Sequence, residues 1–324
     1  MVLSEGEVEI LEYLKEEKKE AHKILFTGLD DAGKTSIILA LKREFSKIAM
    51  IKPTKGAQRR IFKFLDKEIS EWDLGGQATY RISYLKNPSK FFAGTEVAIY
   101  VIDIQNQQRI IESLSYLKDV INEFKKLEIF PPINVFFHKF DPLLVKTAQT
   151  KLTNLSYELA EKINNSIEYD NIHYYYTSIY NLPSLMSTMS EILLELYPKA
   201  ELISKTIKEF ALKIECEGLI VIDNNSFIVG SYSIDDQTQD ILYACAPYFL
   251  SLNETFQQKG LNENENEMII QKFGKYFLFK QIAFEEDMPY YLLILKNDIL
   301  PQFYMDDTTY NDFIKLIKNI LEIE

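Results

Sequence analysis

Short apolar runs alternate with helical patterns along the chain up to about residue 195. Four of these runs are Ile24 to Phe26, Val97 to Ile102, Ile133 to Phe137 and Ile172 to Tyr176, with helical patterns such as Lys34 to Arg43 and Arg109 to Lys126 between them. This alternation predicts a mostly parallel sheet with helices on both faces. Two more runs, Arg60 to Leu65 and Ile69 to Trp72, predict an antiparallel hairpin that brings this α/β sheet to six strands.

The pattern changes after Pro198, which ends the preceding helix. The remaining elements are a helix (Ala200 to Glu215), two strands (Leu219 to Asp223, Ser226 to Ser231), a helix (Gln237 to Gln258), three strands (Met268 to Lys272, Tyr276 to Ile282, Tyr290 to Leu295) and a helix from about Asp306. We expect a tight Asn224-Asn225 turn between the first two strands, because Asn tolerates positive φ. The chain therefore divides into residues 1–198 and an α+β domain of residues 199–324.

Composition and charge limit the kinds of partner that the chain can bind and the compartment in which it works. The chain has 324 residues and 47% hydrophobic content, enough for two cores, and its net charge of −12 disfavours nucleic acid and anionic membranes as partners. Two cysteines cannot build a disulfide framework or a zinc cluster. Signal-peptide, lipidation and membrane-span patterns are lacking, which favours a cytoplasmic protein that reaches membranes only through a partner.

The N-terminal segment has a helical pattern of its own. Ser4 and Glu7 form a capping-box pattern, which predicts a charged helix through Lys19. Packing on the next domain is favoured over membrane insertion for this helix.

Residues 28–35 read GLDDAGKT and fit the phosphate-loop pattern G-x-x-x-x-G-K-[ST], directly after a predicted strand and before a predicted helix. Backbone N–H groups of such a loop, together with the helix N-terminus, bind phosphate oxygens. Lys34 would contact the β and γ phosphates, and the Thr35 hydroxyl would bind Mg²⁺. The candidate nucleotide contacts in this segment are Gly28, Asp30, Asp31, Ala32, Gly33, Lys34, Thr35 and Ser36.

A second segment, WDLGGQ at residues 72–77, ends a predicted strand. Asp73 would hold Mg²⁺ there, and Gly76 would let its N–H approach the γ phosphate, which a side chain would obstruct. Gln77 is the candidate catalytic residue, because it can orient the attacking water. Thr54 lies in a polar stretch between the two motifs and would join the Mg²⁺ site only while the γ phosphate is present.

The segment HKFD at residues 138–141 follows another predicted strand and is a candidate base-binding site. The Asp141 carboxylate can accept hydrogen bonds from two donors of guanine that adenine lacks, while the stem of Lys139 covers the ring. Ser178 and Ile179, at the end of the last strand, would offer backbone N–H to guanine O6. His138 either contacts the base or braces a neighbouring loop.

Together these motifs resemble the small-GTPase family and span the whole first domain. Segments 28–35 and 72–77 look like those of Arf-type GTPases, whereas 138–141 and 176–180 look like those of Rag (Gtr) GTPases. The second domain has the element order of the roadblock module that Rag proteins use to dimerise, with a longin domain as the near alternative. The resemblance implies a GTP- and Mg²⁺-binding switch in nutrient signalling or membrane traffic, homo- or heterodimeric, with a scaffold, exchange factor or activating protein as partners.

Two positions depart from the wider family. Asp30 stands where Ras-type loops have a glycine, and it would obstruct an arginine entering from an activating protein. His138 replaces the usual asparagine, so a brace onto the phosphate loop must come from the imidazole or be lost. We expect slow hydrolysis of GTP to GDP and phosphate, and the alternative is a nucleotide-bound scaffold whose hydrolysis is incidental.

Overall fold

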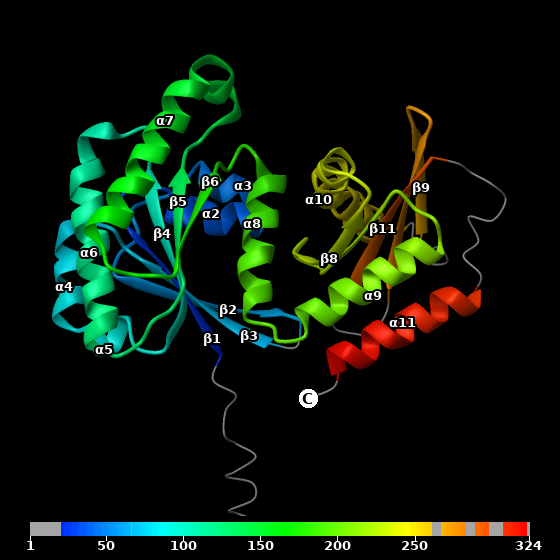
Figure 1. Cartoon of the computed structure of the whole chain (residues 1–324), viewed down its shortest axis with the longest axis horizontal. Helices are drawn as coiled ribbons and strands as arrows, with labels where there is room; N and C mark the ends of the chain where they lie inside the picture. Colours follow the sequence, from blue (N-terminus) through cyan, green and yellow to red (C-terminus); the bar gives the residue numbers. More distant parts are fainter. Residues whose placement is uncertain (1–20, 66, 261–266, 283–288, 298–306, 323–324) are drawn as a thin grey trace, which may run out of the picture.

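The structure is a computed structural model that describes residues 21–65, 67–260, 267–282, 289–297 and 307–322. Two sheets, each covered by helices, form the molecule (Figure 1). This confirms the predicted fold class, while the exact boundary at residue 198 stays a prediction. The helix predicted from Ser4 to Lys19 lies outside the described residues. In the part of the chain that is described, no helix is both long and apolar enough to span a membrane.

The first sheet has six strands in the order β2-β3-β1-β4-β5-β6, and β2 alone runs antiparallel to its neighbour. Its strands are β1 His22–Gly28, β2 Ala57–Phe64, β3 Lys67–Leu74, β4 Thr95–Asp103, β5 Ile133–His138 and β6 Ile172–Thr177. The helices of this half are α2 Lys34–Leu41, α3 Phe45–Ile48, α4 Ala78–Lys86, α5 Pro88–Phe91, η1 Gln107–Arg109, α6 Ile110–Lys126, α7 Pro142–Ser166 and α8 Leu182–Glu195. The β2–β3 hairpin is present as predicted.

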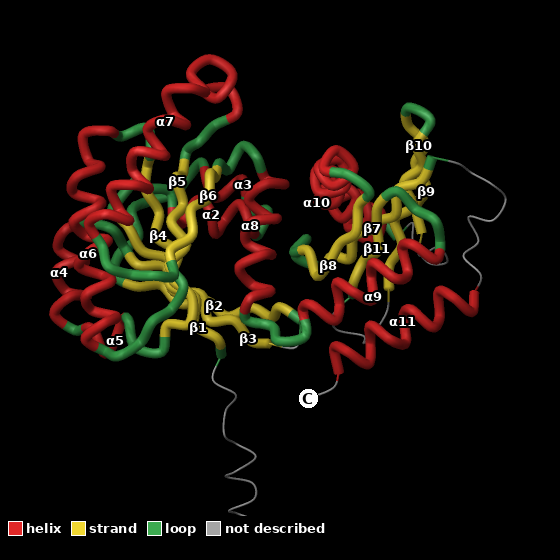
Figure 2. Tube along the Cα trace, in the orientation of Figure 1, coloured by secondary structure: helices red, strands yellow, loops and turns green. Residues whose placement is uncertain are grey.

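Apolar spacing explains how the helices cover this sheet. In α6, Leu117, Val120, Ile121 and Phe124 recur at three- and four-residue steps, and all four are buried against the sheet. Helices α4, α6 and α7 lie on this face, whereas α2 and α8 cover the other (Figure 2). The central strand β1 is buried from both sides, which its uninterrupted apolar run requires.

The second sheet is antiparallel, with the order β8-β7-β11-β10-β9. Its elements are α9 Ala200–Lys213, β7 Gly218–Ile222, β8 Ile228–Ser233, α10 Asp236–Gln258, β9 Glu267–Lys272, β10 Lys275–Ile282, β11 Tyr290–Lys296 and α11 Asp307–Glu322. Helices α9 and α11 pack on one face and α10 on the other. The element order is the predicted one: helix, two strands, helix, three strands, helix.

The turn between β7 and β8 differs from the prediction. Asn224 and Asn225 do not form a tight two-residue turn with positive φ; the positive φ of 72° belongs to Ser226. The Asp223 carboxylate accepts hydrogen bonds from the N–H groups of Asn225 and Phe227, both at 2.8 Å, and so stabilises a wider turn. A local side-chain hydrogen bond has therefore replaced the backbone preference of asparagine.

This wider turn packs against the first half of the molecule. Phe227 is buried and lies 6.0 Å from Phe62 and 5.9 Å from Phe64, measured between ring centroids. Ser190 of α8 accepts a 2.7 Å hydrogen bond from the N–H of Ile228. One core cluster consequently contains side chains of both sheets.

A paired substitution tests how strongly this contact stabilises the molecule. We expect Phe227→Ala to lower the free energy of unfolding by roughly 3–5 kcal/mol, because it removes a buried ring and leaves a cavity. Phe273→Ala, at a side chain that is 91% exposed, is the matched control and should change it little. Urea titration and calorimetry measure both; equal effects of the two substitutions would show that the Phe227 contact contributes no specific stability.

Candidate functional site

The loop between β1 and α2 has glycines where the backbone permits nothing else. Gly28 has φ 136°, and a Cβ there would lie 2.4 Å from the carbonyl oxygen of Val101. Gly33 has φ 99°, and its Cβ would lie 2.5 Å from the ring of His138. These close approaches place the loop against Val101 of β4 and His138 of β5, at the carboxyl end of the sheet, where it leads into α2.

Lys34 is buried at the start of α2. Its Nζ donates to the carbonyl oxygens of Leu29, at 2.7 Å, and Gly28, at 3.2 Å. Burial lowers the pKa of Lys34 to about 8, although the nearby carboxylates of Asp73 and Asp30 raise it. The ammonium group therefore lies within the loop itself. The negative charge of a bound phosphate would stabilise the protonated form of Lys34, which burial disfavours.

An open pocket of about 390 Å³ lies over this loop. It is lined by Asp30, Asp31, Gly33, Lys34, Thr35, Ser36, Ile51, Lys52, Pro53, Thr54, Gly76, Gln77 and Lys139. Most of the predicted phosphate and metal contacts are thus brought together around one space. Gly28 and Ala32 do not line this pocket, and Ala32 is buried in the core.

The three predicted metal ligands converge. The Thr35 hydroxyl donates to Asp73 Oδ2 at 2.7 Å, and its oxygen lies 2.8 Å from Thr54 Oγ1. Asp73 is fully buried, and its Oδ1 has no hydrogen-bond partner among the described residues. One carboxylate and two hydroxyls are hard oxygen donors, so this group fits a divalent cation such as Mg²⁺ that also takes phosphate oxygens and waters.

Gly76 and Gln77 lie directly against the phosphate loop. A Cβ on Gly76 would come within 2.1 Å of the Leu29 carbonyl carbon and of the Asp30 nitrogen, so only glycine permits this contact. Gln77 caps the start of α4, where its carbonyl oxygen accepts hydrogen bonds from the N–H groups of Tyr80 and Arg81. Its side chain borders the pocket beside Thr54 and Lys34.

The predicted base-binding residues meet at the ends of β5 and β6. Asp141 Oδ1 accepts a hydrogen bond from the Ser178 hydroxyl at 2.6 Å, and Oδ2 accepts one from the Gln105 amide at 3.0 Å. Each carboxylate oxygen has a second lone pair, so the group keeps acceptor capacity for a base. Lys139 forms an ion pair with Asp103 at 2.6 Å and lines the pocket over the phosphate loop. Ile179 follows Ser178 and packs against the core.

Of the two roles expected for His138, contact with the base or bracing of a neighbouring loop, the structure shows the second. Its ring is buried against Gly33, and Nδ1 lies 2.9 Å from the Thr177 hydroxyl. Burial, together with the charge of Lys139, lowers the pKa of His138 to about 3. A neutral imidazole therefore contacts the phosphate loop at Gly33.

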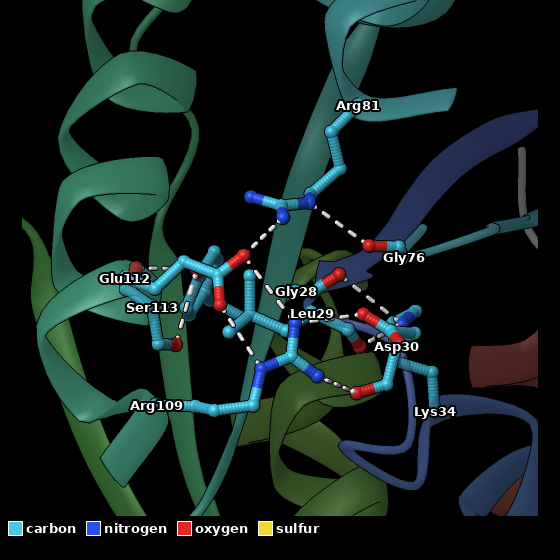
Figure 3. A network of polar contacts seen from close by, with 10 residues as sticks. Gly28, Leu29, Asp30, Lys34, Gly76, Arg81, Arg109, Glu112 and Ser113 are labelled. Carbon is cyan, nitrogen blue, oxygen red and sulfur yellow. Dashed lines mark hydrogen bonds and ion pairs between the residues drawn. The ribbon is translucent and has the colours of Figure 1, made fainter. Parts of the chain in front are cut away.

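Several residues at the site lie outside the sequence motifs and were not predicted. Arg109 binds Asp30, and Arg81 binds the Gly76 carbonyl oxygen, with Glu112 between the two arginines (Figure 3). The three-residue spacing of Arg109 and Glu112 at a helix start signals an ion pair but not its neighbours. Gln105 was not predicted either, because a single glutamine in a loop belongs to no recognisable motif. Asp30, expected to obstruct an incoming arginine, is paired with Arg109 of its own chain.

Comparison with known proteins places these features in a family. Residues 23–246 match the family described as Gtr1/RagA G protein conserved region. ADP-ribosylation factor-like protein 3 of Chlamydomonas reinhardtii is 36% identical over 136 residues, which are 42% of this chain and 72% of that protein. ADP-ribosylation factor-like protein alp41 of Schizosaccharomyces pombe is 33% identical over 180 residues, 56% of this chain and 87% of that protein.

Among solved structures, the Arl6 BBS3 small GTPase from Trypanosoma brucei, with bound nucleotide analogue GppNp, aligns with a TM-score of 0.42 and 18% identity. The alignment covers 53% of this chain and 95% of that one. The family match covers more than half of the chain and continues into α10 of the second half. The chain therefore belongs to the Gtr1/RagA G-protein family, and its first half is an Arf-like GTPase domain.

Proposed function

We propose that the chain is a Mg²⁺-dependent guanine-nucleotide switch that hydrolyses GTP slowly and works as a dimer. The convergence of Thr35, Thr54 and Asp73 carries this proposal. These residues come from three separate segments: Thr35 lies in the first turn of α2, Thr54 precedes β2, and Asp73 lies near the end of β3. A γ phosphate and its metal would hold both ends of the hairpin against the phosphate loop, and hydrolysis would release them.

The hydroxyls of Thr35 and Thr54 and the carboxylate of Asp73 would hold Mg²⁺. The ion would neutralise charge on the β and γ phosphates, which also attract Lys34. The chain's own residues do the remaining work: Gly76 approaches the γ phosphate through its backbone, and Gln77 orients the attacking water. Both border the pocket that Lys34 and Thr54 line.

Guanine specificity is assigned to Asp141. Its carboxylate is held by Ser178 and Gln105 and would accept hydrogen bonds from guanine N1–H and the exocyclic amine. Adenine lacks this donor pair, so ATP is disfavoured as the substrate.

The second half supports association with a second copy or a related chain through a roadblock- or longin-type module. Strand β9 pairs on one side only among the described strands, with β10, and Ile269 and Ile270 on it are 50% and 37% exposed. Helix α10 buries Leu242 and Phe249 on its own sheet but leaves Tyr248 69% exposed. An open strand edge beside exposed apolar groups favours pairing with another sheet.

Signalling or membrane traffic is the expected setting. A cytoplasmic chain recruited to membranes through a scaffold, with an exchange factor and an activating protein setting its nucleotide state, fits the family and the charge of −12.

Base specificity can be tested by exchanging one carboxylate. Asp141→Asn should weaken GTP binding by roughly one to two decades, the equivalent of a lost charged hydrogen bond, and should admit xanthosine triphosphate. Its amide can donate to the C2 carbonyl that xanthine carries. Asp170→Asn, at an exposed carboxylate before β6, is the control. Competition binding with GTP, ATP and xanthosine triphosphate decides; a wild type that prefers ATP would overturn the assignment.

Water orientation can be tested in a single turnover. Gln77→Leu should slow hydrolysis of bound GTP by about tenfold or more while GTP affinity stays close to that of the wild type, because the side chain acts on water. Gln237→Leu, at an exposed glutamine in the first turn of α10, should change neither quantity. Unchanged hydrolysis in Gln77→Leu would remove the catalytic role and favour the scaffold alternative.

Association can be tested on the full chain by sedimentation. We expect a dimer, with itself or with a related partner, that Ile270→Lys on β9 weakens by placing a charge on the pairing edge. Ile61→Lys is the matched control, at a 56% exposed isoleucine on the edge strand β2 of the first sheet. A chain that stays monomeric in both nucleotide states, alone and with related partners, would contradict the dimeric switch.

A further inference from the structure

A chain of alternating charges joins the phosphate loop to the loop that carries Gln77. Arg109 Nη2 donates to Asp30 Oδ1 at 2.8 Å, and its Nε donates to Glu112 Oε2 at 3.0 Å. Arg81 pairs with the other oxygen of Glu112, and its Nε donates to the Gly76 carbonyl oxygen at 2.9 Å. Figure 3 shows the two guanidinium groups on either side of the Glu112 carboxylate, one reaching Asp30 and the other Gly76.

Arg81 fixes the backbone on both sides of Gln77. Its side chain holds the carbonyl oxygen that precedes Gln77, and its N–H donates at 3.0 Å to the carbonyl oxygen of Gln77 itself. The peptide on each side of Gln77 is therefore oriented by the same residue. Since side-chain direction follows from backbone φ and ψ, this double contact restricts where the Gln77 amide can point.

The Arg81 side chain is itself held in place. It is only 12% exposed, and its guanidinium lies 5.1 Å from the centre of the Tyr116 ring. The Tyr116 hydroxyl accepts a hydrogen bond from Thr27 of β1, which connects the ring that Arg81 contacts to the central strand. Glu112 supplies the carboxylate in direct contact with this guanidinium, since Tyr116 and Gly76 are neutral, and Asp30 adds only a weaker attraction.

Both carboxylates of the network stay ionised at neutral pH. Burial raises the pKa of Asp30, but the hydrogen bond and charge of Arg109 outweigh this and lower it overall. The hydrogen bond from Arg109 also lowers the pKa of Glu112, and Arg81 adds to the effect. Two positive and two negative groups thus alternate, which lets Asp30 remain beside the phosphate site with its charge compensated.

We propose that Arg81 is a positioning residue for Gln77, and that Glu112 and Arg109 hold it by linking it to Asp30 of the phosphate loop. The inference rests on the proposed water-orienting role of Gln77. It predicts that the network acts on GTP hydrolysis and leaves GDP binding alone, because the proposed function assigns Gly76 and Gln77 to the γ phosphate, which GDP lacks. A residue that only supported the fold of α4 would affect both, or neither.

The test uses the full chain with Mg²⁺ and compares three variants. Arg81→Met and Glu112→Gln should each slow single-turnover GTP hydrolysis by about tenfold, with the GDP dissociation constant within about twofold of the wild type. Arg81→Lys should lie between, since an ammonium can donate to Gly76 but cannot bind both groups as a guanidinium does. The Arg81→Met/Glu112→Gln double variant should be no slower than either single one, because both remove the same link.

Matched controls are Lys86→Met at the exposed end of α4 and Glu158→Gln on the exposed side of α7, and both should hydrolyse GTP at the wild-type rate. Thermal melting checks that each variant is folded, and Glu112→Gln keeps the inference testable if Arg81→Met is not. Wild-type hydrolysis in a folded Arg81→Met or Glu112→Gln, or equal losses in hydrolysis and GDP affinity, would overturn the positioning role. Gln77→Leu in the same assay separates the two claims: if it is slow while Arg81→Met is not, only the positioning role fails, and if it is not slow, the proposed function fails as well.

Discussion

Parallel pairing of β3, β1, β4, β5 and β6 is the constraint on which the site depends. Parallel strands end at the same edge of a sheet, so the segments that follow them must meet there. The phosphate loop follows β1, the Gly76 segment follows β3, and the base-binding residues follow β5 and β6. Buried apolar strands fix this register, because a one-residue slip would move core residues such as Phe26 and Val101 to the opposite face of the sheet, where they would not fit.

Motifs that bind through the backbone could be predicted from the sequence. Gly28 and Gly33 have positive φ and leave no room for a Cβ, and such requirements appear directly in the residue type. Thr35, Thr54 and Asp73 were assigned to one ion from their motifs, and the fold places the Thr35 hydroxyl within hydrogen-bonding distance of both Thr54 and Asp73. The element order of the second half followed from apolar spacing in the same way.

Contacts between side chains distant in sequence could not be predicted. Arg81, Arg109 and Glu112 are ordinary charged helix residues until the fold brings α4 and α6 beside the phosphate loop. The contact of Gln105 with Asp141 likewise could not be predicted, because the two residues are far apart in the sequence. The β7–β8 turn was misjudged because the Asp223 side chain, rather than asparagine backbone preference, decided its shape. Its Phe227 also joins the second half to the β2–β3 hairpin, whose other end reaches Thr54 and Asp73.

The buried His138 makes the molecule sensitive to acid. Its pKa is about 3 in the folded protein, far below the ~6.5 of an exposed histidine in the unfolded chain. Above pH 6.5 both states are neutral at this residue, and folding is not penalised. Between pH 6.5 and 3 only the unfolded chain takes up the proton, so stability falls by up to about 1.4 kcal/mol for each pH unit. Because the His138 ring packs against Gly33, the integrity of the phosphate loop is therefore coupled to the acidity of the solution.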